Sequence, residues 1–164
     1  ELAEVTELYN LRLALETPLG EPVMANHTRA DIDRLAAMVT QMENDTGEDR
    51  EAWSNLNYEF HRSTYELANR PHTLRLVTQI LNLVEPYSRI YVHYLDHLGR
   101  VHAEHRMMIQ ALESGDSDLL ASAITDHLEG ARDGVAKAME SALEPDDPLS
   151  LLQGPDPRTG TGTD

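Results

Sequence analysis

Apolar residues recur at steps of three and four along almost the whole chain, and this spacing constrains the fold more than any other feature of the sequence. Such steps place side chains on one face of an α-helix. No segment of useful length alternates apolar and polar residues with the period of two that a half-buried strand requires. The sequence therefore predicts an all-α fold, an antiparallel bundle of six or seven helices joined by short loops.

Helix-breaking and helix-capping residues divide this pattern into segments. The first helix begins at Leu2 and should end near Pro18 and Gly20, where the chain kinks or restarts. Thr28 is a suitable N-cap for the second helix, and Gly115 suits the end of the helix before the last. The other predicted helices cover about 49–67, 72–97, 98–114 and 117–143, and Pro86 should kink the second of these or divide it in two.

Composition limits the functions open to the chain. Its 164 residues include 13 Lys and Arg against 29 Asp and Glu, a formal net charge of −16 that repels phosphate backbones, so we do not expect this segment to bind nucleic acid. The absence of cysteine excludes disulfides, thiolate zinc sites and cysteine nucleophiles. No apolar run approaches the roughly 20 residues that a membrane span needs. We expect a cytoplasmic protein without membrane contact.

The chain divides by composition into two parts. Residues 1–143 carry the helical pattern and are predicted to form one domain. Residues 144–164 consist largely of Pro, Gly, Asp and Thr, so we expect a disordered acidic tail. Because Glu1 is not an initiating methionine and the helical pattern begins at once, the chain is expected to be a piece of a longer protein.

The eight histidines are the best candidates for a functional site, since neutral imidazole is the commonest metal ligand in proteins. Three of them, His61, His105 and His127, fall on predicted inner helix faces. Asn57 lies one turn before His61, so its amide oxygen and that imidazole share a face. Taken singly, a helical histidine is more often a surface or hydrogen-bonded core residue than a ligand.

A second set of histidines competes with the first. His93 and His97 are four residues apart, which by spacing alone makes them a better metal pair than Asn57 and His61. His102 adds a nearby candidate. Spacing does not decide between the two sets.

Several short motifs follow one another along the chain. Residues 7–16 contain the R-x-x-L-E segment Arg12-Leu13-Ala14-Leu15-Glu16. Further along stand, in order, Asn57-Tyr58-Glu59-Phe60-His61, Asn69-Arg70-Pro71, Glu104-His105, Gly115-Asp116 and Asp126-His127-Leu128. The ordered set, which spans residues 2–143, resembles the FCD domain, the effector-binding module of FadR-type regulators in the GntR superfamily. The corresponding family motifs are D-x-x-F-H, N-P, E-H, G-D and H-L.

The resemblance implies a divalent metal ion in the middle of the bundle, held in that family by one Asp and three His. Carried over residue by residue, the ligands are Asn57, His61, His105 and His127. Asn57 departs from the family pattern because its amide oxygen brings no charge to offset the cation. We expect weaker metal binding, or reliance on a carboxylate of the effector as the missing anion. Zinc is the first expectation, and nickel, cobalt, iron and manganese suit the same donors.

The resemblance also implies a sensor and not an enzyme. A small carboxylate effector bound in the metal site would bridge several helices, and the altered packing would change how an N-terminal winged-helix domain, absent from this chain, binds DNA. The expected partners are a small organic acid, a second copy of the chain in a homodimer, and DNA only through the absent domain.

Three further residues are candidates for ligand binding. Arg12 is a possible second anchor, since a guanidinium facing the interior binds a carboxylate through two parallel hydrogen bonds. A salt bridge to Glu16, one turn later, is an equally good interpretation. Tyr87 and Arg89, beside Pro86, are weaker candidates for the pocket lining.

Two other functions stay open at this stage. A three-histidine site with open positions can activate water, so a metal-dependent hydrolase is one alternative, with Glu104 or Glu59 as general base. A metal-free structural module for helical interactions is the other. In that module the three histidines would hydrogen-bond one another, water and Asn57.

Overall fold

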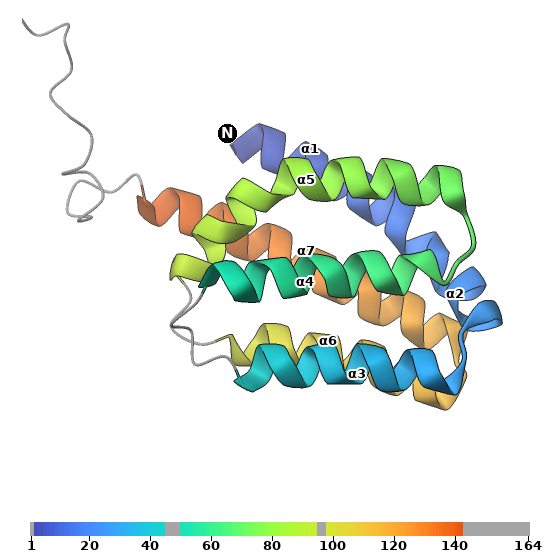
Figure 1. Cartoon of the computed structure of the whole chain (residues 1–164). Helices are drawn as coiled ribbons and strands as arrows, with labels where there is room; N and C mark the ends of the chain where they lie inside the picture. Colours follow the sequence, from blue (N-terminus) through green and yellow to red (C-terminus); the bar gives the residue numbers. More distant parts are fainter. Residues whose placement is uncertain (1, 45–49, 95–97, 143–164) are drawn as a thin grey trace, which may run out of the picture.

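The computed structural model describes residues 2–44, 50–94 and 98–142. Within these ranges all regular structure is helical, which confirms the predicted all-α class. Figure 1 shows the long helices running in alternating directions along the chain, as an antiparallel bundle. In chain order the elements are α1 (Leu2–Glu16), η1 (Thr17–Leu19), α2 (Gly20–Asn26), α3 (Arg29–Asn44), α4 (Arg50–Glu66), α5 (Pro71–Tyr94), α6 (Gly99–Ser114) and α7 (Ser117–Ala142).

The break predicted at Pro18 and Gly20 is a change of helix type. A single 3-10 turn, η1, joins α1 to α2, and α2 starts at Gly20. A Cβ atom at residue 20 would lie 3.0 Å from the backbone nitrogen of Ala121. Residue 20 therefore packs closely on α7 because it has no side chain.

Side-chain caps begin two of the helices, and one of them is the N-cap that the sequence predicts at Thr28. The Thr28 hydroxyl accepts a hydrogen bond from the Asp31 amide at 3.3 Å, and the Asp31 carboxylate accepts one from the Thr28 amide at 2.9 Å. Asp116 caps α7 by accepting from the amides of Asp118 and Leu119, each at 3.0 Å. These bonds satisfy amide groups that the first turn of a helix leaves unpaired.

The turn between α6 and α7 requires a left-handed residue. Gly115 has a φ of 72° and its amide donates to the Leu112 carbonyl at 3.3 Å. Since a Cβ disfavours this conformation, Gly115→Ala is expected to lower the free energy of unfolding by about 1 kcal/mol in urea denaturation. Gly99→Ala, which meets open space in the first turn of α6, is the control and should not destabilise the domain. Equal losses in the two variants would contradict this account of the turn.

The sequence predicts either a kink or a division at Pro86. Helix α5 continues through Pro86, so the division into two helices does not occur. Its start lies one residue before the predicted one. Asn69, with a φ of 51°, follows α4, and Pro71 is the first residue of α5. Beyond Pro86, the Tyr91 ring lies against α7 at Gly134, where a Cβ atom would be 2.3 Å from the ring.

The core of the bundle is apolar but includes several buried polar side chains, and these define the site. Helices α4, α6 and α7 each bring one histidine into the core. None of the described helices is both long enough and apolar enough to cross a membrane. The predicted disordered tail, residues 144–164, lies outside the described residues. The largest fully buried apolar side chains are Tyr9, Leu35, Met42, Phe60, Tyr65, Met108, Leu112, Leu120, Ile124 and Leu128.

Candidate metal centre

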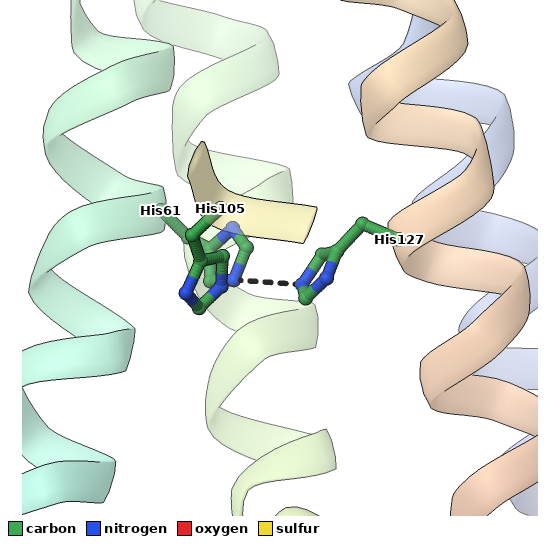
Figure 2. A group of neighbouring side chains, drawn as sticks. All are labelled: His61, His105 and His127. Carbon is green, nitrogen blue, oxygen red and sulfur yellow. Dashed lines mark hydrogen bonds between the residues drawn. The ribbon is translucent and has the colours of Figure 1, made fainter. Parts of the chain in front are cut away.

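Three histidines from three helices meet in the middle of the bundle. Figure 2 shows His61 of α4, His105 of α6 and His127 of α7 with their rings turned toward one another. One ring nitrogen from each lies within 4.8 Å of the other two, and no residue of the three is more than 4% exposed. The structure therefore brings together the three histidines that the sequence places on inner faces.

The hydrogen bonds of His127 fix the tautomer and the orientation of its ring. Its Nδ1 atom lies 2.9 Å from the Glu104 carboxylate, which can only accept, so Nδ1 carries the proton. Its Nε2 atom, on the opposite side of the ring, lies 3.2 Å from Nε2 of His61. A carboxylate behind a histidine is the arrangement that fixes the tautomer and orientation of metal-binding imidazoles. The sequence contains Glu104 in the Glu104-His105 motif, but not the information that it contacts His127.

Several buried polar atoms of this cluster lack a hydrogen-bond partner among the described residues. They are both ring nitrogens of His105, Nδ1 of His61 and Oδ1 of Asn57. Leaving a buried polar group unpaired costs about 1–3 kcal/mol, and such groups are rare in native proteins. Lone pairs on imidazole nitrogen and amide oxygen are suitable ligands for a divalent metal ion. The residues present therefore fit a bound metal.

The environment keeps two of the imidazoles neutral. Burial lowers the pKa of His61 and of His105 well below the ordinary value of 6.5, and proximity to His127 lowers both further. A neutral imidazole has a lone pair to offer, whereas an imidazolium has none. His61 and His105 are thus in the protonation state that metal binding requires.

Two small cavities adjoin His61, and each has a volume of about 30 Å³. That is space for water or for one small polar group. Both are lined by Arg12, Trp53, Asn57, His61 and Ser88. We call one cavity the histidine chamber, because His127 also lines it, together with Tyr9, Tyr91, Val101 and Ala131. We call the other the serine chamber, because Ser54 also lines it, together with Tyr58, Leu81, Val84 and Glu85.

Arg12 forms the salt bridge to Glu16 that the sequence allowed as one of two roles. Its Nε and Nη2 atoms donate to the two carboxylate oxygens of Glu16 at 2.7 and 3.2 Å, and both side chains are buried. Burial by itself would lower the pKa of Arg12, but the Glu16 carboxylate outweighs burial and raises it. Arg12 also lines both chambers, so the salt bridge and a place beside a ligand coexist.

The structure places Tyr87 and Arg89 away from the histidines. The Tyr87 hydroxyl donates to the Glu4 carboxylate at 2.8 Å, and Arg89 pairs with Glu85, one turn earlier on α5. Neither residue lines a chamber, whereas Ser88 between them lines both. The reason is the phase of α5, since a rotation of about 100° per residue turns the neighbours of an inward residue away.

The competing histidines are described only in part. His102 accepts a hydrogen bond from Nε1 of Trp53 at 3.0 Å. The His93 side chain and residue His97 lie outside the described part of the chain. Of the two candidate general bases, Glu104 holds His127, and Glu59 lies on the surface beside Arg62, 3.6 Å away.

The comparison with known protein families agrees with this geometry. The family model of the FCD domain matches residues 7–130, which include all four residues of the predicted ligand set. The chain belongs to the FCD domain family. A comparison with curated proteins found no match for this FCD domain.

Two solved structures share the fold of the FCD domain. A GntR-family transcriptional regulator from Pseudomonas syringae pv. tomato str. DC3000 is 22% identical with a TM-score of 0.74, and the alignment covers 85% of this chain and 59% of that protein. E. coli McbR/YncC is 15% identical with a TM-score of 0.70, over 85% of this chain and 69% of that protein. FCD domains of GntR-family regulators are regulatory modules and not enzymes, so the family gives the hydrolase alternative no support.

Proposed function

We propose that this FCD domain senses a small organic acid with a divalent metal ion held by Asn57, His61, His105 and His127. The observation that carries the proposal is the buried His105 side chain, whose two ring nitrogens have no partner among the described residues. A structural histidine in a core would be hydrogen-bonded. The competing proposal of a metal-free module leaves these nitrogens unexplained.

The ligand set explains why the effector should be an anion. A divalent ion bound there would supply a Lewis-acidic centre for an anionic oxygen. Three neutral imidazoles and the Asn57 amide leave its charge uncompensated, and a carboxylate would restore the balance. We propose zinc first, with nickel, cobalt, iron or manganese as alternatives that suit the same donors.

Arg12, in the lining of both chambers, supports a carboxylate ligand. A guanidinium has five donor hydrogens, and the two bonds to Glu16 use two of them. Because Arg12 lines both chambers, a ligand in either one would lie beside a fixed positive charge. Tyr87 and Arg89, which line neither chamber, have no part in the proposed site.

The proposal includes a homodimer and DNA binding by a separate domain. Leu76 and Leu83, one heptad apart on the outer face of α5, are 49% and 57% exposed and support self-association. The chain spans about three fifths of the P. syringae regulator, 59% of its length. Because the chain has a net charge of −16, which repels the DNA backbone, the proposal assigns DNA contact to a winged-helix domain outside these residues.

Thermal denaturation in the presence of small acids tests the proposed function. A ligand that binds only the native state stabilises it, by about 2.7 kcal/mol at a concentration 100 times Kd. We expect at least one acid among acetate, propionate, succinate and their hydroxylated counterparts to raise the Tm of the zinc-loaded domain by several degrees. The chelator-treated domain is the control and should respond much less. If none of these acids shifts the Tm of the zinc-loaded domain, the proposal is wrong.

A further inference from the structure

The serine chamber contains a buried hydroxyl group that neither the proposed metal site nor the Arg12–Glu16 pair explains. Ser54 of α4 is 7% exposed, and its Oγ atom has no hydrogen-bond partner among the described residues. Serine is a common residue on helix surfaces, but a buried hydroxyl without a partner is unfavourable. Its position in the wall of the chamber means that a molecule inside the chamber can supply the missing bond.

The serine chamber adjoins the histidine chamber. The two share Asn57 and His61, which are predicted metal ligands, and Arg12, which is the proposed carboxylate anchor. A ligand whose carboxylate lies against these shared residues can therefore place a neighbouring group in the serine chamber. With a volume of about 30 Å³, this chamber accepts a small group and not a long chain.

The chemistry of the wall selects among small groups. An alkyl group would leave the Ser54 hydroxyl unpaired and buried. A second carboxylate would lie near the Glu85 carboxylate, which lines the same chamber, and repulsion between the two would disfavour it although Arg89 pairs with Glu85. An ammonium group would lie near Arg12 and the proposed metal ion, which are both positive. A hydroxyl group can both donate to and accept from Ser54 without any such conflict.

We infer that Ser54 is a specificity-determining residue that selects a small hydroxy acid, by hydrogen bonding to its hydroxyl group, over the same acid without that hydroxyl. The inference rests on the proposed function, because it takes the carboxylate of the ligand to lie beside the shared residues. It adds the class of ligand and the side chain that distinguishes this class.

Acids that differ by one hydroxyl group test the inference. The pairs are glycolate and acetate, lactate and propionate, and malate and succinate, each titrated into the zinc-loaded domain by isothermal titration calorimetry. In the parent, the hydroxylated member of at least one pair should bind about tenfold more tightly than its partner, the effect of one neutral hydrogen bond. In Ser54→Ala the ratio of the two affinities should fall to near one, and the affinity for the unhydroxylated acid should not change.

Two controls separate ligand recognition from a structural role. Ser63→Ala changes another buried serine of α4, one that lines neither chamber, and should keep the preference of the parent. Without ligand, Ser54→Ala should unfold at the same temperature as the parent or a higher one, because it removes an unpaired hydroxyl. A serine with a structural hydrogen bond would instead lower that temperature.

The outcomes distinguish this inference from the proposed function. If acids bind but the parent shows no preference, or if Ser54→Ala keeps the preference, the inference is overturned and the proposed function stands. If no acid binds to the zinc-loaded domain, the proposed function falls and the inference falls with it. If the preference is lost in Ser54→Ala and kept in Ser63→Ala, the result supports both the inference and the proposed function.

Discussion

Replacing His105 with alanine is expected to abolish metal binding by the domain. The parent, purified without chelator and without a histidine tag, should contain about one divalent ion per chain by plasma mass spectrometry, and His105→Ala close to none. The reason is geometric. His105 is fully buried, and one of its nitrogens lies within 4.8 Å of the ligand atoms of His61 and His127, so its loss removes one of three converging imidazoles.

A matched control is available on the surface. His72 is an exposed histidine of α5 whose ring lies 2.7 Å from Arg75, and His72→Ala should keep the metal content of the parent. Far-UV circular dichroism verifies that each variant is folded. Metal retained in His105→Ala would move the site toward His93 and His97. A parent free of metal would favour the structural module and overturn the proposed metal centre.

Breaking the buried ion pair of α1 should produce the largest loss of stability. Arg12→Met removes the guanidinium that contacts both oxygens of Glu16, a residue with no exposed surface. A buried charge without its partner typically costs about 3–5 kcal/mol, so we expect the free energy of unfolding to fall by about that amount in urea denaturation.

Two further variants separate the effect of charge from that of side-chain volume. Arg12→Met combined with Glu16→Met should regain much of the lost stability, because an apolar pair of similar size leaves no buried charge. Arg29→Met is the surface control, since Arg29 also pairs with an acid four residues later but its side chain is 71% exposed. Arg29→Met should lower the free energy of unfolding by less than about 1 kcal/mol. Similar losses for Arg12→Met and Arg29→Met would show that burial of the pair has little effect.

The ends of the helices could be predicted because the chemistry that fixes them is local. Thr28 and Asp116 cap helices through bonds to amides two or three residues away, and Gly115 ends α6 in a conformation that disfavours other residues. Pro86 was harder. Proline removes one backbone hydrogen bond, but packing on both sides of the residue decides whether the helix continues, and here α5 does.

The site could be predicted only in part from spacing. That His61, His105 and His127 converge depends on how α4, α6 and α7 pack, and the spacing within one helix carries no such information. The ordered motifs supplied it. The rotation of α5 about its axis was also beyond the sequence. Tyr87 and Arg89 were predicted for the pocket lining, whereas Ser88 between them lines both chambers. Ser54 gave no signal in the sequence, because only its burial without a partner distinguishes it.

The contact between Tyr91 and Gly134 has a consequence for how ligand preference can diverge among related domains. Tyr91 lines the histidine chamber, and its ring occupies the space where a side chain at residue 134 would begin, 2.3 Å from the Cβ position. A larger residue at position 134 would displace the ring and reshape the chamber, although residue 134 does not line it. Evolution, or protein engineering, can thus change the shape of this chamber through the spacing of α5 and α7 while every residue of the proposed ligand site is kept.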